Sequence, residues 1–242
     1  MIEIKHLYKK YGQHTIFEDF NLNIMNGDFV IVTGKSGCGK TTLMNIISSL
    51  ESADAGEIIV DGVDIRKKRN QLCYLRDHVG FLFQNYGLIE NKTVRYNMRI
   101  IEKKARSGVT MEEALKSVDM DSKIDSFVYE LSGGEQQRVA LARLMYKKCS
   151  VIFADEPTGS LDKDNAIRVM KILSQLNREG KTILMVTHDL SLISFGTIIV
   201  DLMNHTVIRP KDAMNSIYDE ANTEDIHKLS VTNNNLDQCS NN

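Results

Sequence analysis

A glycine-rich run ends in a lysine and two threonines. The run consists of Gly34, Lys35, Ser36, Gly37, Cys38, Gly39, Lys40, Thr41 and Thr42. Glycines let successive backbone N–H groups point at phosphate oxygens, and the start of a helix adds its positive end. Lys40 is then placed to neutralise β- and γ-phosphates, and the Thr41 hydroxyl to ligate Mg²⁺. An ordinary turn before a helix would explain the glycines but not Lys40-Thr41, so the run predicts a phosphate-binding loop.

Two adjacent carboxylates, Asp155 and Glu156, follow the apolar run Val151–Ala154. The pattern is typical of a buried strand, and in open α/β sheets ligands bind at the carboxyl edge of the strands. The alternative is a pair of charges in the first turn of a helix. Pro157-Thr158-Gly159 follows directly and favours a turn instead. The pair is therefore a candidate for metal binding and catalysis.

The segment Leu131–Arg138 reads LSGGEQQR. Ser132 and Glu135 alone satisfy the pattern of a capping box at a helix start. That role does not require Gly133 and Gly134, which each cost roughly 1 kcal/mol against alanine inside a helix. Two glycines at a helix start therefore suggest close approach to an anion.

Together these segments resemble the ATP-binding subunits of ABC transporters, over residues 1–209. The resemblance implies that ATP and Mg²⁺ are bound, that Asp155 holds Mg²⁺ through water, and that Glu156 polarises the attacking water. It also implies a head-to-tail dimer of two copies of the chain with two ATP molecules at the interface. The expected contacts with the partner's γ-phosphate come from Ser132, Gly133, Gly134 and Glu135. Ser160-Leu161-Asp162 resembles the family's dimer-contact loop.

Three single residues complete the constellation that the resemblance implies. Gln84 matches a glutamine that senses Mg²⁺ and water, His188 a histidine that bonds the γ-phosphate, and Tyr11 an aromatic residue that stacks on adenine. Each has a plainer alternative: a solvated glutamine, a structural histidine, and Tyr8 in place of Tyr11. The expected catalytic residues are Lys40, Gln84, Glu156 and His188. The expected metal-binding residues are Thr41, Gln84 and Asp155.

Within the family the chain resembles the branch of macrolide exporters, lipoprotein-release subunits and FtsE-like subunits (MacB/LolD/FtsE-like). The segment Phe83–Val94 looks most like bacteriocin exporters. The resulting hypothesis is an ATPase that drives a membrane permease and exports a peptide, bacteriocin or antimicrobial. Tyr86, Leu88 and Ile89 then either belong to the core or form a groove that accepts a short helix of the permease. The alternative is an FtsE-like ATPase that signals across the membrane in cell division.

Short β-like runs precede and follow a long helical stretch. Asp61-Gly62 predicts a hairpin turn, Thr110 and Glu113 form a capping-box pair, and a further helix is expected around Ala166–Leu176. The pattern predicts an α/β fold: a P-loop NTPase (RecA-like) core with an N-terminal antiparallel β region and an inserted α-helical subdomain. We expect one ABC ATPase domain over 1–242, with the α/β core in 1–84 and 149–209 and the helical subdomain in 85–148. The extension 210–242 ends in Asn-rich sequence, which predicts disorder of the last residues.

Composition limits the partners. The formal net charge is −2 with 26% charged residues, which gives no strong attraction to nucleic acid. A DNA or ribosome clamp of the same superfamily is disfavoured for this reason and because the chain has one phosphate loop. The apolar runs are too short to cross a bilayer, no leader opens the chain, and the four cysteines show no paired spacing. We expect a cytoplasmic protein, peripheral on the inner face of the membrane through the permease.

Overall fold

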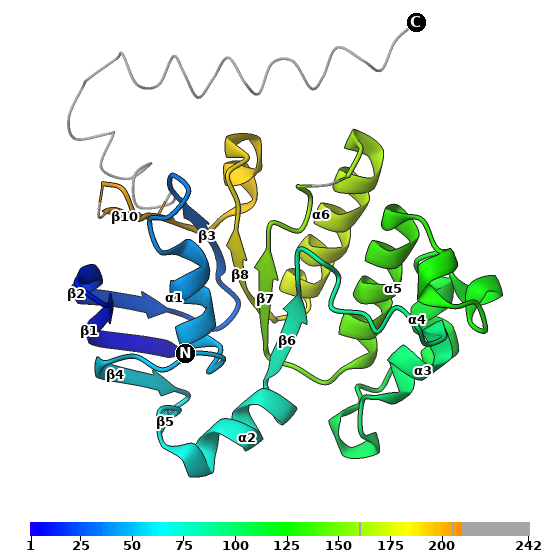
Figure 1. Ribbon diagram of the computed structural model, residues 1–242, viewed down its shortest axis with the longest axis horizontal. Coiled ribbons are helices and arrows are strands. Elements are labelled where there is room, and N and C mark those ends of the chain that lie inside the picture. The colour runs from blue at the N-terminus through cyan, green and yellow to red at the C-terminus, as the bar shows by residue number, and fades with distance from the viewer. Residues whose placement is uncertain (160, 205, 210–242) are drawn as a thin grey trace, which may run out of the picture. The chain divides into compact units, whose positions relative to one another are not determined.

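The computed structural model describes residues 1–159, 161–204 and 206–209 (Figure 1). Ser160 of the expected dimer-contact loop and the extension 210–242 lie outside the described residues. The fold predicted from the sequence is confirmed: an α/β core with an antiparallel sheet and a helical insert. Among the described residues, no helix combines the length and apolar character that crossing a membrane requires.

The larger sheet positions the candidate site. Its strand order is β10-β9-β3-β8-β7-β6, and the pairs β3–β8, β3–β9, β7–β8 and β6–β7 are parallel. The strands are β3 (Phe29–Thr33), β6 (Val79–Leu82), β7 (Val151–Asp155), β8 (Thr182–Val186), β9 (Ile198–Asp201) and β10 (Thr206–Ile208). Every residue of β3 and β8 is buried, as expected for parallel strands covered on both faces.

Two apolar clusters cover the two faces of this sheet. Phe29 and Ile31 belong to a cluster with residues of α5 (Gly133–Tyr146) and α6 (Lys163–Arg178). Val30 and Val32, which alternate with them along β3, belong to a second cluster with α1 (Lys40–Ile47) and the antiparallel sheet. The alternation places α1, and with it Lys40, on one face of the sheet and α5 on the other.

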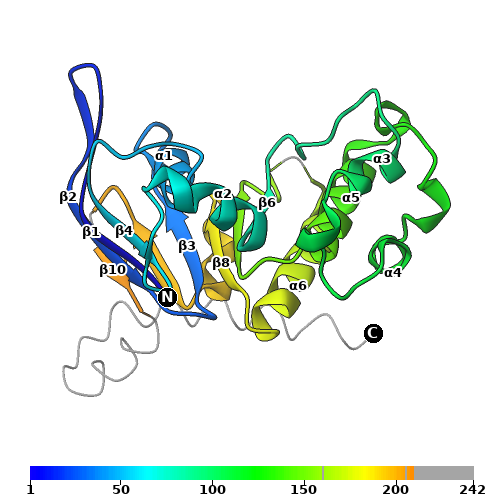
Figure 2. The same ribbon diagram turned by 90° about the horizontal axis from the view of Figure 1, so that it is seen from below.

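The antiparallel sheet has the order β2-β1-β4-β5. Its strands are β1 (Ile2–Tyr11), β2 (His14–Ile24), β4 (Ala55–Val60) and β5 (Val63–Asp64). The β4–β5 turn is Asp61-Gly62, predicted from the sequence, with φ of 47° and 80°. Positive φ at both positions is the mark of a favoured hairpin turn. Figures 1 and 2 both place this sheet and α3–α5 on opposite sides of the parallel strands.

The stretch 85–148 is helical as predicted, but most of its helices are short. They are α3 (Val94–Arg99), α4 (Met111–Lys116), three short 3-10 helices and the long α5. The capping box at Thr110 and Glu113 begins α4 as predicted, and α6 extends beyond the predicted range Ala166–Leu176 at both ends. The helix α2 (Lys68–Asp77) was not predicted, because only Tyr74 of its ten residues is buried and the apolar periodicity is weak.

Candidate functional site

The glycine-rich loop joins the end of β3 to the start of α1. Gly39 is the N-cap residue of α1 with φ of 99°, a conformation that favours glycine. A Cβ at this position would also lie 2.5 Å from Cγ2 of Ile16. Both the backbone conformation and the space therefore require glycine at this point. No side chain at the N-cap accepts from the first backbone N–H groups of α1, which suits a helix start that binds an anion.

Lys40 spans the loop that precedes it. Its Nζ donates hydrogen bonds to the carbonyl oxygens of Gly34 at 2.7 Å and Lys35 at 3.0 Å. The ammonium group is thus held against the glycine-rich loop. A positive charge in this place can neutralise the outer phosphates of a nucleotide.

Asp155 lies at the end of β7, where its carboxylate contacts the Thr41 side chain through a hydrogen bond. Burial raises the pKa of the Asp155 carboxyl, the neighbouring Glu156 raises it further, and Lys40 and Thr41 oppose the shift. A divalent cation would relieve the same repulsion between the two carboxylates.

The pair Thr41 and Asp155 fits Mg²⁺. This ion prefers oxygen ligands and is usually held by one or two carboxylates together with water and substrate phosphates. Within the described ranges no group of three or more His, Cys, Asp or Glu residues could hold a metal ion. One hydroxyl and one carboxylate beside the phosphate loop are nevertheless the donor set that a nucleotide-bound Mg²⁺ uses.

Glu156 follows Asp155 with φ of 44°, which is uncommon for a residue other than glycine. Its backbone N–H donates to the Val186 carbonyl at 2.9 Å, and its carbonyl accepts from the Gly159 N–H at 3.1 Å. The turn at Pro157–Gly159 agrees with the sequence prediction, and α6 begins only at Lys163, so Glu156 is not in a helix. Strained residues of this kind are concentrated at functional sites.

The Glu156 carboxylate meets His188, which follows β8. Nδ1 of His188 lies 2.9 Å from Oε1 of Glu156, and the His188 backbone N–H donates to Oε2 at 3.4 Å. The Glu156 side chain is 15% exposed and that of His188 is 73% exposed. The parallel pairing of β7 with β8 brings the two residues to the same edge of the sheet. A carboxylate held in this way can orient a water molecule beside a bound phosphate.

Gln84 lies at the same edge. The parallel pairing of β6 with β7 places Leu82 beside Ala154, so Gln84 is level with Glu156, two residues beyond each partner. The Gln84 side chain is exposed. Its position suits a contact with water or a metal-bound phosphate.

Tyr11 ends β1 and is 48% exposed. Its hydroxyl donates to the Glu51 carboxylate and also contacts the side chain of Thr42 at the start of α1. The Lys9 ammonium lies 4.9 Å from the centre of the Tyr11 ring. These contacts hold Tyr11 beside the phosphate loop. The Glu51 contact was not anticipated, because no sequence signal links it to Tyr11 across 40 residues.

The segment Ser132–Glu135 forms the predicted capping box at the start of α5. The Ser132 N–H and hydroxyl both donate to Oε2 of Glu135, at 2.8 and 2.9 Å, and these bonds lower the pKa of Glu135. A Cβ at Gly133 would lie 3.0 Å from the Tyr86 hydroxyl, and one at Gly134 would lie 3.3 Å from Nδ2 of Asn165. The two glycines therefore have a packing reason that the sequence did not reveal, in addition to any contact with an anion.

Comparisons with known proteins agree with this site. A family profile described as "ABC transporter" matches residues 17–159. The chain is 39% identical over 219 residues to the macrolide export ATP-binding/permease protein MacB of Mannheimia succiniciproducens, covering 86% of this chain and 34% of that protein. It thus spans about a third of the length of the MacB relatives that it matches.

Other relatives match along almost their whole length. The uncharacterized ABC transporter ATP-binding protein MJ1508 of Methanocaldococcus jannaschii is 36% identical over 219 residues, covering 86% of this chain and 98% of that protein. The dimeric structure of the ATP-binding cassette MJ0796, in a post-hydrolysis state with ADP and Pi, superposes with a TM-score of 0.73 at 34% identity. That match covers 83% of this chain and 94% of the other.

Proposed function

This chain belongs to the ABC transporter family as an ATP-binding subunit that binds Mg²⁺-ATP and hydrolyses it, and we propose that two copies dimerise on ATP to drive a membrane permease. The observation that carries the proposal is the convergence of three pairs at one sheet edge. They are Lys40 with its loop carbonyls, Thr41 with Asp155, and Glu156 with His188.

The chemistry within one protomer follows from these positions. Backbone N–H groups of the loop and the Lys40 ammonium bind the phosphates, and Tyr11 stacks on the base. Thr41 and Asp155 hold Mg²⁺, which neutralises charge on the outer phosphates when it is bound. Glu156 polarises the attacking water, while His188 and Gln84 orient it and the γ-phosphate. Phosphoryl transfer needs mainly such positioning and charge neutralisation.

The second protomer completes each site. Ser132 and Gly134 are exposed or half-buried at the start of α5, where the helix dipole favours an anion. The dimeric state of the relative MJ0796 supports an arrangement in which these residues face the nucleotide of the partner copy.

The permease is a separate protein in this proposal, and this chain lies against it on the cytoplasmic side of the membrane. The MacB relatives combine an ATP-binding part and a permease in one chain for macrolide export, which favours transport over FtsE-like signalling. Export of a peptide, bacteriocin or antimicrobial is the proposed task, supported by the resemblance of Phe83–Val94.

The test is the variant Glu156→Gln in size-exclusion chromatography with light scattering. Removal of the charge should leave Mg²⁺-ATP binding intact and slow hydrolysis at least about 100-fold, so that the dimer accumulates with ATP but not with ADP. Lys40→Ala is the matched control that should bind ATP poorly and stay monomeric. A Glu156→Gln protein that remains monomeric at saturating ATP, or hydrolyses ATP at the wild-type rate, contradicts the proposal.

A further inference from the structure

The first turns of α5 contact the chain just beyond Glu156 through a buried glutamine. Gln137 is 2% exposed, and its Nε2 donates to the Pro157 carbonyl oxygen at 2.9 Å. Pro157 is the residue next to Glu156. Because a buried amide that loses its partner is strongly unfavourable, this hydrogen bond fixes the distance between α5 and the Glu156 turn.

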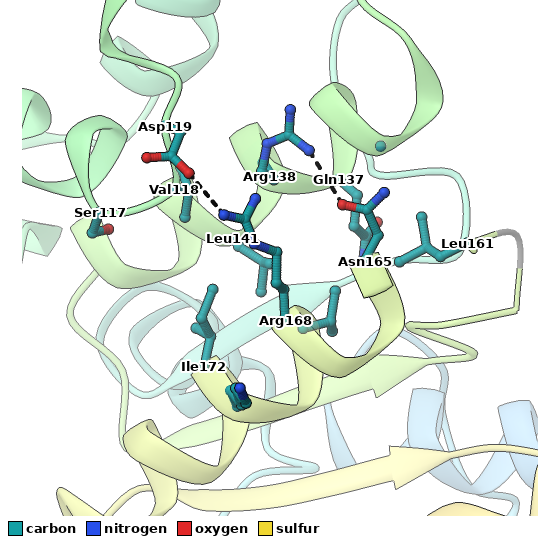
Figure 3. A pocket seen from close by; sticks show the side chains of 13 residues that line it. Ser117, Val118, Asp119, Gln137, Arg138, Leu141, Leu161, Asn165, Arg168 and Ile172 are labelled. Atoms are coloured by element: carbon teal, nitrogen blue, oxygen red, sulfur yellow. Dashed lines mark hydrogen bonds and ion pairs between the residues drawn. The ribbon is translucent and has the colours of Figure 1, made fainter. Parts of the chain in front are cut away.

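A second contact lies one residue further along α5. Nη1 of Arg138 donates to Oδ1 of Asn165 at 3.3 Å (Figure 3). Nδ2 of Asn165 donates in turn to Oδ2 of Asp162 at 2.6 Å. Asp162 also caps α6 by accepting from the Asn165 backbone N–H at 2.9 Å. The Asn165 amide lies directly against Gly134, since a Cβ there would be 3.3 Å from Nδ2. The Asn165 side chain, in the first turn of α6, therefore packs against Gly134 at the start of α5.

Deeper in the protein, α5 and α6 share one apolar cluster, which includes Leu141 of α5 and Leu173 of α6. A pocket of about 210 Å³ lies between them and the end of α4, lined by Val118, Leu141, Leu161 and Ile172 (Figure 3). An ion pair between Arg168 and Asp119, at 3.0 Å, spans it, but both side chains are more than half exposed and such pairs contribute little. At the start of α5, the hydrogen bond of Gln137 reaches the turn after Glu156, and that of Arg138 reaches Asn165 at the start of α6.

We propose that Gln137 and Asn165 are positioning residues that couple the two ATP sites of the dimer. This inference rests on the dimer of the proposed function. In that dimer, Glu156 acts on the nucleotide of its own protomer, whereas Ser132 and Gly134 act on the nucleotide of the partner. The hydrogen bonds of Gln137 and Asn165 make Gly134 and Glu156 move together. Binding of Gly134 to the nucleotide of the partner protomer therefore positions the Glu156 carboxylate at the nucleotide of its own protomer. Coupling of this kind appears as cooperativity of hydrolysis in ATP.

The experiment compares Gln137→Met with Gln136→Met. Methionine keeps the length of the side chain and removes the donor. Gln136 is a matched control, because its Nε2 donates to the carbonyls of Val128 and Leu131, at 3.3 and 3.1 Å, within the helical region. Asn165→Ala is a second test variant, and its site is half-buried, so it leaves a smaller hole in the protein.

In the wild type we expect cooperative hydrolysis with a Hill coefficient well above one. In Gln137→Met and Asn165→Ala the coefficient should fall to about one and kcat should fall roughly tenfold, within the usual range of coupling energies. Binding of Mg²⁺-ATP to the monomer, measured with a fluorescent nucleotide, should stay within about twofold, because the phosphate loop is untouched. Gln136→Met should match the wild type in all three measurements.

The outcomes separate the two proposals. A wild type that neither dimerises nor hydrolyses cooperatively contradicts the proposed dimer. A cooperative wild type with unchanged cooperativity in Asn165→Ala, and in Gln137→Met where thermal melting shows it folded, overturns the coupling role. Equal loss in Gln136→Met and Gln137→Met also overturns it, because the effect would then belong to α5 in general. If Gln137→Met does not fold, Asn165→Ala decides alone.

Discussion

Nδ1 of His188 lies 2.9 Å from Oε1 of Glu156, and the backbone N–H of the same histidine reaches the other oxygen at 3.4 Å. The residue expected to bind the γ-phosphate therefore also holds the residue expected to polarise water. The two come from adjacent parallel strands, β8 and β7. The relationship makes His188 a support for the geometry of Glu156 as well as a candidate ligand of the phosphate.

The first prediction concerns this pair. His188→Ala should lower kcat for Mg²⁺-ATP hydrolysis by about 100-fold, in the range for loss of a positioned proton-transfer group, and change KM by less than about threefold. Steady-state phosphate release measures both. The matched control is His6→Ala, which removes a histidine placed 2.6 Å from another carboxylate, Asp19, on the antiparallel sheet. Its activity should equal that of the wild type, and a comparable loss would argue against a specific role of His188.

A second prediction follows from the raised pKa of Asp155. A carboxyl whose pKa is higher in the folded protein binds protons more readily there than in the unfolded chain, so stability falls as the pH rises through that pKa. At neutral pH the ionised Asp155 therefore destabilises the protein in the absence of nucleotide. Asp155→Asn removes the charge and should raise the melting temperature by roughly 2 °C.

The same variant separates stability from function. Asp155→Asn should lose most hydrolysis and most of the stabilisation by Mg²⁺-ATP, because Thr41 is left without its charged partner for Mg²⁺. Differential scanning fluorimetry with and without Mg²⁺-ATP measures both effects. In acid, Asp155 of the wild type becomes protonated. The melting temperatures of the wild type and of Asp155→Asn, both without nucleotide, should therefore converge. A variant less stable than the wild type at neutral pH would contradict the cause given for the pKa shift.

Local signals in the sequence predicted most of the fold. The Asp61-Gly62 turn and the capping boxes at Thr110 and Ser132 depend on neighbours within three residues, and the structure agrees with each. Short continuous apolar runs such as Val151–Ala154 predicted the parallel strands, because strands buried on both faces of a sheet are apolar at every position. The placement of Asp155 and Glu156 at a sheet edge followed from the strand that precedes them.

What the sequence could not predict depends on contacts between distant segments. The hydrogen bond from Gln137 to Pro157 joins residues twenty positions apart, and the approach of Tyr86 to Gly133 joins a loop residue to the start of α5. Neither has a local pattern, since a buried glutamine and a solvated one look alike in a single sequence, and the approach of Tyr86 to a glycine leaves no mark on the neighbours of either residue. The positive φ of Glu156 is also set by bonds to Val186 and Gly159 rather than by its own preference.

A third prediction concerns the surface that meets the permease. Tyr86 and Leu88 pack partly buried against the core, whereas Ile89 is 42% and Tyr129 62% exposed. The two exposed residues belong to one region, because the Tyr129 N–H donates to the Glu90 carbonyl at 3.2 Å and the Tyr129 ring stacks on Phe127. Exposed aromatic and aliphatic side chains that lie in one surface region suit contact with an apolar helix of a partner protein.

Replacement of Ile89 and Tyr129 by serine should therefore abolish co-purification with the permease while ATP hydrolysis by the isolated subunit and its melting temperature stay near wild type. Leu72→Ser is the control, since Leu72 is 76% exposed on α2, outside this surface. It should co-purify normally. Normal co-purification of the double variant would place the permease contact elsewhere.

The last prediction concerns Cys38, the thiol in the phosphate loop. The sequence allowed either a reactive thiolate among N–H groups or a small side chain that fills space. Cys38 packs partly buried against the apolar cluster of α1, and its sulfur lies 2.6 Å from where a Cβ at Gly34 would be.

Cys73 is exposed, and Cys149 is buried with a raised pKa. The packing of Cys38 favours a small side chain that fills space over a reactive thiolate. A maleimide should therefore label Cys73 before Cys38, and Cys149 last. Mg²⁺-ATP should slow the labelling of Cys38 but not of Cys73, because nucleotide covers the loop.

Peptide mass mapping after brief labelling resolves each site, including Cys239, which lies outside the described residues. Cys38→Ser should hydrolyse ATP normally and resist slow inactivation by the reagent, whereas Cys73→Ser should be inactivated like the wild type. Labelling of Cys38 ahead of Cys73 would restore the reading as an activated thiolate. Labelling of Cys38 that Mg²⁺-ATP does not slow would mean that bound nucleotide leaves this part of the loop uncovered, which contradicts the position assigned to the phosphates.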